Sequence, residues 1–321
     1  MFIFDYILSS RNIMSSELIS VIMSTYNEPE DWIRKSIESI LGQTLQKLEF
    51  LIVCDNPNNK ELINLLEEYK NRDSRIKLIL NDENIGLTKS LNKALNITVG
   101  TFIARMDSDD IAMSDRLEKQ LKYLKDNNLD LVGSGVVCID EEENEIATLN
   151  NLPKNNEAFK KRIIYNNCMP HPTWFGKAEV FKENRGYRDV PYAEDYDFLL
   201  RSLDKGFRLG NIKEVLLKYR MRSTSISNKN GLKQFLISQK LVERYKNETI
   251  SNKDTIEDVK NIITSTTKDD EEEYYKASTY FTQGAMKIKR FNPVGGVLVL
   301  RAFTSSKYYR KKIKCYIKGL V

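Results

Sequence analysis

The sequence is poor in the features that mark disulfide-rich, secreted and membrane-spanning proteins. Its 321 residues include only four cysteines, which are far apart and form no C-x-x-C pair. This spacing argues against a disulfide framework or a zinc site and favours a reducing compartment. No run approaches the roughly 20 apolar residues of a membrane-spanning helix, and the first residues lack the basic start and cleavage site of a signal peptide. We therefore expect a soluble cytoplasmic protein that starts at Met1 or at Met14.

The sequence also lacks the glycine-rich loops that cradle phosphates in two common nucleotide-binding classes. Neither G-x-G-x-x-G nor G-x-x-x-x-G-K-[ST] occurs, so dinucleotide-binding and P-loop folds have no support. Any bound nucleotide must be held by other groups.

Acidic residues are missing from the end of the sequence. From Tyr274 to Val321 there are eleven Lys or Arg and no Asp or Glu, although the net charge of the whole chain is only +5. The preceding residues are therefore mildly acidic, whereas the tail is strongly basic. A basic tail is typical of proteins with an anionic partner, such as a membrane surface or a nucleic acid.

Short apolar runs alternate with helical patterns in the first half of the sequence. The runs that predict buried strands are residues 18–23, 50–54, 76–80 and 101–106. Helices are predicted from Pro29, over residues 62–69 and over residues 87–95. Buried strands separated by helices predict an α/β fold with a mostly parallel sheet and right-handed crossovers. In such sheets, ligands bind at the carboxyl ends of the strands.

The pattern of the second half is mixed, and from Lys229 onward it is almost wholly helical. We divide the chain into an N-terminal extension (1–17), one domain (18–228) and a helical C-terminal region (229–321). Residues 251–273 are the most polar and are expected to form a flexible surface. The other expected elements are a helix over 114–127 capped by Ser114, strands 130–139 and 145–149 around a solvated acidic turn 140–144, a helix 158–165, an extended piece from His171, a helix 195–205, and separate strands 207–209 and 215–220.

Polar side chains follow each of the four predicted parallel strands. They begin at Ser24, Asp55, Asn84 and Asp107. Any single group of this kind is ordinary turn chemistry. Since the carboxyl ends of parallel strands meet at one edge of a sheet, four groups in register favour a site across which a nucleotide lies.

The run Asp107-Ser108-Asp109-Asp110 places three carboxylates in four residues. Like charges this close repel one another, and a divalent cation would relieve the repulsion. Mg²⁺ and Mn²⁺ prefer oxygen ligands and often bind through one or two carboxylates together with substrate phosphates. The run therefore predicts an enzyme that handles a diphosphate; the alternative is a solvated acidic turn followed by a helix N-cap.

Together, these motifs resemble those of the family 2 glycosyltransferases. The string ISVIMSTYNE, from Ile19 to Glu28, is similar to the opening of that family, as is its spacing to Asp55, to Asn84-x-Gly86 and to the acidic run. The segment YAEDYDF, from Tyr192 to Phe198, is similar to the family's E-D-x-D-F segment. The resemblance covers residues 18–227. It implies the GT-A fold with a C-terminal helical extension, and a nucleotide-sugar donor.

The resemblance also implies roles for single residues. Asp55 would hydrogen-bond the base of the donor, and Asp107 and Asp109 would form the D-x-D element that holds Mn²⁺ or Mg²⁺, with Asp109 as the direct ligand and Asp110 orienting the loop. The donor-binding residues that it implies are Thr25, Tyr26, Glu28, Asp55, Asn84, Lys89, Arg105 and Asp107.

Asp195 matches the family's general base. An acceptor hydroxyl needs a base within hydrogen-bond reach, and one carboxylate suffices for inversion by direct displacement, whereas double displacement needs a second carboxylate as nucleophile. The helix N-terminus at Asp195 favours its anionic form, although Glu194 and Asp197 oppose it. The alternative is that Glu194 and Asp195 simply cap the helix.

The sequence departs from the family pattern in two places. Ser24 stands where many relatives have Pro, and Arg220-Met221-Arg222 stands where many have R-x-H. An arginine cannot ligate a metal, but it can contact phosphate oxygens. The only histidine, His171, lies in a segment similar to one on the family's acceptor side; its alternative role is a structural hydrogen bond. We group Glu194, His171 and Arg222 as residues of the acceptor side or of the diphosphate.

The sequence as a whole predicts an inverting, metal-dependent glycosyltransferase that moves a sugar from a UDP-sugar donor to a glycan or lipid-linked acceptor in surface polysaccharide biosynthesis. Apolar residues 294–303 and basic residues 307–314 suit a helix on anionic lipid at the inner face of the membrane, or a helix packed on the domain. Alternative functions are a sugar-nucleotide pyrophosphorylase, although its glycine-rich basic loop is absent, and a nucleic-acid-binding protein that uses the tail; we expect no nucleic-acid partner.

Overall fold

The computed structural model describes residues 17–222, 230–289 and 291–319. The chain divides into two compact units. The first, the sheet unit, comprises residues 1–159, 168–188 and 205–222, and the second, the helical unit, comprises 160–167, 189–204 and 223–321. The choice between Met1 and Met14, and all but one residue of the expected N-terminal extension, lie outside the described residues.

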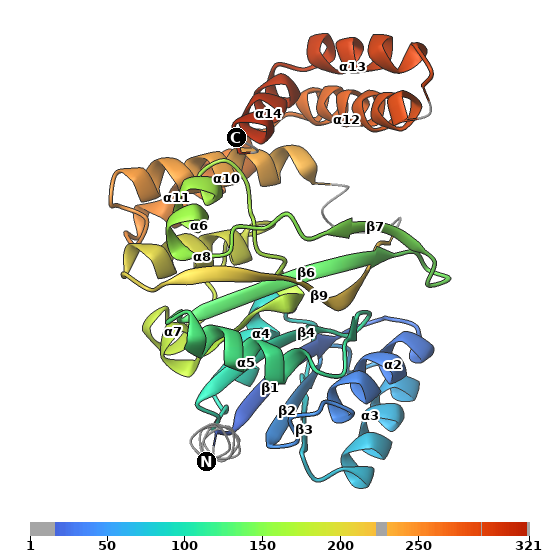
Figure 1. Cartoon of the computed structure of the whole chain (residues 1–321), viewed down its shortest axis with the longest axis vertical. Helices are drawn as coiled ribbons and strands as arrows, with labels where there is room; N and C mark the ends of the chain where they lie inside the picture. Colours follow the sequence, from blue (N-terminus) through green and yellow to red (C-terminus); the bar gives the residue numbers. More distant parts are fainter. Residues whose placement is uncertain (1–16, 223–229, 290, 320–321) are drawn as a thin grey trace, which may run out of the picture. The chain divides into compact units, whose positions relative to one another are not determined.

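Alternating strands and helices build the first half of the sheet unit, as the sequence predicts (Figure 1). All neighbouring strands in the order β3-β2-β1-β4 are parallel. The chain adds strands on one side of β1 and then returns to place β4 on the other side. This reversal is a topological switch point, where ligands bind at the carboxyl ends of the strands. The elements are β1 (Ile19–Thr25), α2 (Glu30–Leu41), β2 (Leu48–Cys54), α3 (Lys60–Arg72), β3 (Ile76–Leu80), α4 (Leu87–Leu95) and β4 (Phe102–Asp107).

The burial of these elements explains their sequence patterns. Every residue of β2 is buried, as expected for a parallel strand covered on both faces. In α2, Ile33, Ile37 and Ile40 are buried on one face while acidic residues occupy the first turn. The register places Ser24 of β1 beside Asp107 of β4. The core packing therefore fixes which strand ends meet at the edge of the sheet.

The sheet continues beyond β4 in the order β8-β6-β9-β5, and β7 pairs with β6. Here β9 is one continuous strand, so the prediction of two strands was wrong. Exposed Lys213 and Glu214 interrupt the apolar pattern where the register to β6 shifts at Gly135, which makes one bulged strand resemble two. These elements are β5 (Ile111–Ala112), α5 (Arg116–Asp126), β6 (Leu131–Ile139), β7 (Glu145–Leu149), η1 (His171–Thr173), β8 (Phe175–Lys177), α7 (Ala178–Glu183) and β9 (Leu209–Arg220).

Two local predictions in this region were also wrong. His171 begins a short 3₁₀ helix and not an extended piece, because Pro172 sits in its first turn and fixes φ near the helical value. The helix predicted from Ser114 begins at Arg116, with Asp115 at the N-cap position and no side-chain capping bond. The carbonyl of Ser114 instead accepts a hydrogen bond from Thr44.

The helical unit is built almost wholly of helices, as expected from Lys229 onward. Its core includes Leu232, Phe235, Tyr274 and Ala302. Residues 251–273, expected as a flexible surface, form α11 and the start of α12. No helix in the described part of the chain is both long and apolar enough to cross a membrane. The helices are α8 (Glu194–Asp204), α10 (Gly231–Lys246), α11 (Asp254–Ser265), α12 (Lys268–Lys289), α13 (Val294–Ser305) and α14 (Lys307–Lys318), and α6 (Asn156–Ile163) runs from the sheet unit into this unit.

Candidate active site

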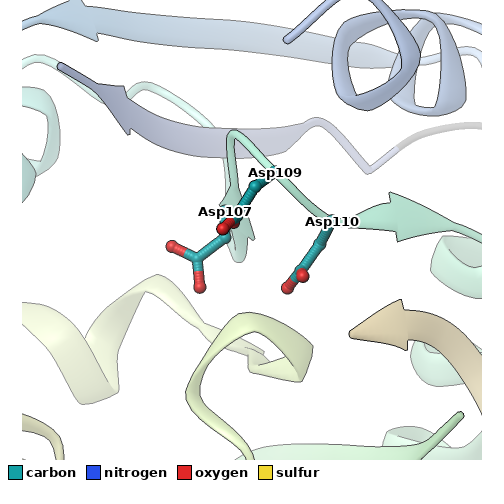
Figure 2. Close-up of side chains that lie close together, drawn as sticks. All are labelled: Asp107, Asp109 and Asp110. Carbon is teal, nitrogen blue, oxygen red and sulfur yellow. The ribbon is translucent and has the colours of Figure 1, made fainter. Parts of the chain in front are cut away.

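Three carboxylates gather at the carboxyl end of β4, beside the switch point of the sheet. Asp107 is the last residue of the strand, and Asp109 and Asp110 follow in the turn that leads to β5. One oxygen of each lies within 4.8 Å of the others (Figure 2). We call Asp107, Asp109 and Asp110 the acidic cluster.

A buried arginine supports Asp107 from inside the sheet. Arg105 is 1% exposed, and its guanidinium forms an ion pair with the Asp107 carboxylate. Burial lowers the pKa of Arg105, but the charge of Asp107 more than offsets this, so the pKa lies above its usual value. Arg105 was predicted to lie near the nucleotide; its burial means that it acts on the site through Asp107.

Asp109 is held by both arginines at the end of β9. An Arg222 nitrogen lies 2.5 Å from an Asp109 oxygen and 3.3 Å from an oxygen of Glu28. Arg220 donates a hydrogen bond to the backbone carbonyl of Asp109 at 2.9 Å. Burial and the charge of Asp107 raise the pKa of Asp109 to about 6, although Arg222 opposes the shift. The Arg222 guanidinium therefore pairs with the carboxylate that we expect to bind the metal ion.

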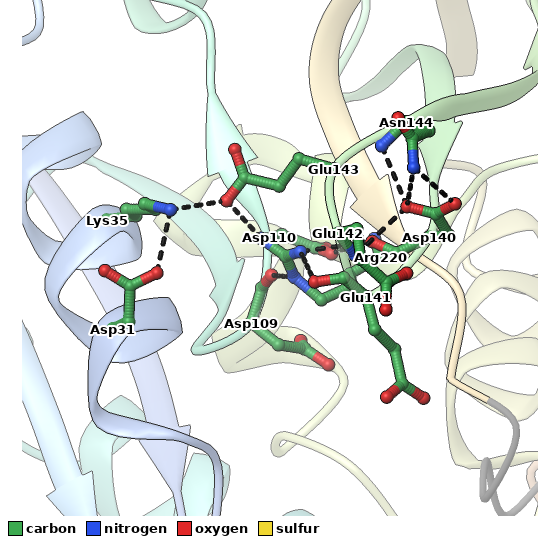
Figure 3. A network of polar contacts seen from close by, with 10 residues as sticks. All are labelled: Asp31, Lys35, Asp109, Asp110, Asp140, Glu141, Glu142, Glu143, Asn144 and Arg220. Atoms are coloured by element: carbon green, nitrogen blue, oxygen red, sulfur yellow. Dashed lines mark hydrogen bonds and ion pairs between the residues drawn. The ribbon is translucent and has the colours of Figure 1, made fainter.

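Arg220 connects the acidic cluster to the tip of the β6–β7 hairpin (Figure 3). Its guanidinium donates to the Asp140 carbonyl at 3.1 Å and lies 3.2 Å from the Glu143 carboxylate. Glu143 also pairs with Lys35 of α2 at 2.7 Å. The prediction that the acidic turn is only a solvated tip was therefore wrong for Glu143, which positions Arg220.

An aromatic side chain stacks on both of these arginines. The Trp32 ring centroid lies 4.6 Å from the guanidinium carbon of Arg220 and 5.4 Å from that of Arg222. Cation–π contacts of this kind orient planar guanidinium groups. Sequence reasoning assigned Trp32 only to the apolar face of a helix, and it missed Glu143, because neither residue has a local signal for these contacts.

The acidic cluster has the donor set of a site for a hard divalent cation. Asp110 is fully buried; one of its oxygens accepts the Arg220 backbone N–H at 2.8 Å, and among the described residues no donor reaches the other. Burial and the charges of Asp107 and Asp109 raise the pKa of Asp110 well above its usual range. Closely spaced carboxylate oxygens, one of them buried without a donor, fit Mg²⁺ or Mn²⁺.

The end of β1 forms a second polar group near the cluster. The Glu28 carboxylate accepts hydrogen bonds from the Thr25 hydroxyl and the Tyr26 backbone N–H, both at 2.8 Å. Burial raises the pKa of Glu28, but these hydrogen bonds and the charge of Arg222 outweigh it and lower the pKa below its usual value. Because Glu28 also pairs with Arg222, the polar residues after β1 and after β4 contact the same guanidinium group.

Asp55 organises the loop that follows β3. It is 3% exposed, and its carboxylate accepts hydrogen bonds from the Asn81 amide at 2.8 Å and from the Ile85 and Gly86 backbone N–H groups at 2.9 Å. Gly86 has φ +83°, which favours glycine. The predicted contact of Asp55 with a base stays a prediction. Asn84 and Lys89, predicted beside the nucleotide, are exposed on this loop and on α4.

Replacing Asp55 with Ala should destabilise the sheet unit. One buried and two partly buried donors would lose their hydrogen bond to Asp55, which corresponds to about 2–4 kcal/mol. Thermal unfolding should show a clearly lower Tm, whereas Asp82→Ala, an exposed change in the same loop, should leave the Tm unaltered. Equal Tm values for the two variants would contradict this role of Asp55.

His171 has the contacts of a structural side chain. Its Nε2 atom lies 2.8 Å from the Tyr187 hydroxyl, and its ring packs edge-on against Trp174. Burial and the charge of Arg105 hold the pKa of His171 well below its usual range. A neutral, hydrogen-bonded imidazole fits the structural alternative better than a contact with diphosphate.

Asp195 lies in the first turn of α8, within the helical unit. Its carboxylate accepts hydrogen bonds from the Asn167 amide and from the Tyr196 backbone N–H, both at 2.7 Å. Asp197, which the sequence suggested as a repelling charge, is fully buried and paired with Arg201 at 2.8 Å. That pairing offsets one of the two charges expected to oppose an ionised Asp195.

Several known proteins are similar to this chain. The family model described as glycosyl transferase family 2 matches residues 20–185. An uncharacterized glycosyltransferase of Methanocaldococcus jannaschii is 39% identical over 233 residues, which are 72% of this chain and 79% of that protein. The O-antigen biosynthesis glycosyltransferase WbnJ of Escherichia coli is 36% identical over 240 residues, 74% of this chain and 92% of WbnJ. The crystal structure of S. aureus TarS 1-349 in complex with UDP-GlcNAc matches with a TM-score of 0.59 and 16% identity over 94% of this chain and 92% of that one.

Proposed function

The chain belongs to glycosyl transferase family 2 and is a glycosyltransferase with the GT-A fold, and from this premise we propose an inverting, metal-dependent transfer from a nucleoside-diphosphate sugar. The observation that carries the proposal is the acidic cluster at the switch point, with Arg222 between Asp109 and Glu28. Carboxylates for a divalent cation and a guanidinium for phosphate oxygens are the groups that a diphosphate leaving group needs.

We propose that the donor carries UDP. Thr25, Tyr26 and Glu28 at the end of β1, with Asp55 at the end of β2, are the groups proposed for the nucleoside. The fold neighbour TarS was solved with UDP-GlcNAc, which supports a uridine nucleotide as the first to test. Asp107 and Asp109 would hold the cation, which stabilises negative charge on the departing diphosphate when it is bound.

In the proposed reaction, the acceptor hydroxyl oxygen forms a bond to the anomeric carbon as the bond from that carbon to the diphosphate oxygen breaks. Asp195 takes the hydroxyl proton, and UDP leaves with the bonding electron pair. A single displacement of this kind inverts the anomeric centre and needs one base. Arg222, once it leaves Asp109, would pair with the phosphate oxygens.

We propose a glycan or a lipid-linked oligosaccharide as the acceptor, in the biosynthesis of a surface polysaccharide. The similarity to an O-antigen biosynthesis glycosyltransferase supports this class. A lipid-linked acceptor places the enzyme at the inner face of the cell membrane. The strongly basic residues 274–321 support that location, because each Lys or Arg near an anionic surface contributes about 1 kcal/mol.

A donor-hydrolysis screen over common nucleotide sugars, with Mn²⁺ and without it, tests the proposed function. Release of UDP from one UDP-sugar, dependent on Mn²⁺, is the expected result. Release of pyrophosphate from a nucleoside triphosphate would instead favour a sugar-nucleotide pyrophosphorylase. Tight, salt-sensitive binding of RNA with no turnover of any donor would favour a nucleic-acid-binding protein.

Metal-dependent donor binding should weaken in mild acid. Asp109, whose pKa is raised to about 6, must be a carboxylate to hold the cation, so protons compete with metal as the pH falls through this value. The affinity for UDP in Mn²⁺ should therefore drop below about pH 6 and be constant above about pH 7, as calorimetry at several pH values would show. A flat profile across this range would contradict the role of Asp109.

A further inference from the structure

The last helices of the chain form a hairpin whose inner side is packed unusually closely. α12 and α13 lie side by side (Figure 1). A Cβ added to Gly284 would lie 2.9 Å from the Gly295 carbonyl, and one added to Gly295 would lie 2.7 Å from the Gly284 carbonyl. Glycine on both helices therefore lets the backbones touch, and Ala302 is fully buried on the same side. The side chains of Val299 and Ile288 also reach this contact, since their atoms would lie 2.9 Å and 2.7 Å from the added Cβ atoms of Gly284 and Gly295.

Several other apolar residues of the hairpin are exposed. Val297 is 55% and Leu300 67% exposed on α13, and Phe291, in the turn between the helices, is 97% exposed. Met286 and Ile288 at the end of α12, and Val294 at the start of α13, are also exposed. We call these six residues the hairpin face. Isolated exposed apolar residues are normal, but a cluster of this kind marks an interaction surface.

α14 presents mostly positive charge, although Tyr316 and Ile317 near its end are also exposed. Its apolar residues Tyr309 and Ile313 are buried in the core of the helical unit, as expected of a helix that packs through one face and leaves its basic face in solvent. The basic residues Lys307, Arg310, Lys311 and Lys314 remain exposed. Arg301, the residue after Leu300 on α13, is exposed as well, and no acidic residue occurs after Glu273.

We propose that the hairpin face docks on the surface of an anionic lipid bilayer, with the end of α12, the turn and α13 entering the interface. This proposal rests on the membrane location proposed above, and it identifies the part of the protein that contacts the membrane. A bilayer interface accepts apolar side chains and anionic headgroups attract basic ones, so one partner accounts for both features. A second copy of the chain would bring two strongly basic surfaces together, and a nucleic acid would leave the apolar residues exposed.

Vesicle sedimentation with the full chain tests this surface. The variant V297D/L300D changes two exposed positions and should fold normally. Its partition onto vesicles of equal parts phosphatidylglycerol and phosphatidylcholine should fall on the order of tenfold or more, because two apolar side chains no longer leave water. The wild-type chain should bind vesicles of phosphatidylcholine alone much more weakly. Ile146→Asp, at an exposed apolar position of β7, is the matched control and should bind as the wild type does.

The possible outcomes separate the alternatives. Unchanged binding by V297D/L300D, or equal binding of the wild type to both vesicles, would overturn the proposal. A wild-type dimer in light scattering that becomes a monomer in V297D/L300D, without a change in vesicle binding, would also overturn it in favour of a second copy. UDP affinity measured on the same samples reports on the donor site separately: failure of all samples to bind UDP would refute the proposed function and leave the vesicle result standing.

Discussion

Replacing Asp195 with Asn should slow sugar transfer by about 10²–10⁴-fold while the affinity for UDP stays the same, because the variant loses only the proton acceptor. Asparagine has the shape of aspartate, and its carbonyl oxygen can still accept the hydrogen bond from the Asn167 amide or from the Tyr196 N–H. It cannot take a proton from the acceptor hydroxyl. Steady-state kinetics with saturating donor and acceptor would measure the loss in kcat.

Asp204→Asn is a matched control for this experiment. Asp204 ends the same helix, is exposed and contacts Ser251, so its replacement should leave both kcat and Tm unaltered. Asp197 is unsuitable as a control because it is buried and paired with Arg201, and its loss should destabilise the protein. Undiminished turnover in Asp195→Asn would leave Asp195 as a helix-capping residue, the alternative that the sequence itself offers.

The secondary structure was predictable in the first half of the chain, where short apolar strand patterns alternate with clear helical patterns. β3 and α4 have the predicted limits, because each is a short regular pattern between clear turn signals. The second half was less predictable, since β9 passes through a register shift at Gly135 and exposed Lys213 and Glu214 hide its continuity. Local sequence does not encode such a bulge, because the partner strand β6 determines it.

The same distinction applies to the candidate site. The strand-end groups were predictable, because parallel topology alone brings Ser24 and Asp107 side by side. The contacts of Arg220 were not, because its partner Asp109 is 111 positions away and Glu143 is 77 positions away. The burial of Arg105 beneath Asp107 was also hidden, because an arginine inside an apolar strand has no sequence signal that separates a surface role from a buried one.

The ion pair between Arg222 and Asp109 leads to a prediction about metal binding by Asp109. The family pattern named in the sequence comparison has a histidine at this position; here the residue is Arg222, whose guanidinium pairs with the Asp109 carboxylate. Metal and arginine therefore compete for one carboxylate. Donor phosphates would relieve the competition, because they offer Arg222 a second set of anionic oxygens.

Replacing Asp109 with Asn should therefore change UDP binding in two directions. In Mn²⁺ the affinity should fall at least about 100-fold, since removal of even an outer-shell partner of a metal ligand costs 10–100-fold. Without metal the affinity should stay the same or rise, because Arg222 loses its strongest partner and becomes free for phosphate. Calorimetry with Mn²⁺ and with a chelator would measure both. Asp126→Asn, an exposed change on α5 paired only on the surface with Lys122, should keep the wild-type ratio of the two affinities; the same ratio in Asp109→Asn would show that the metal is held elsewhere.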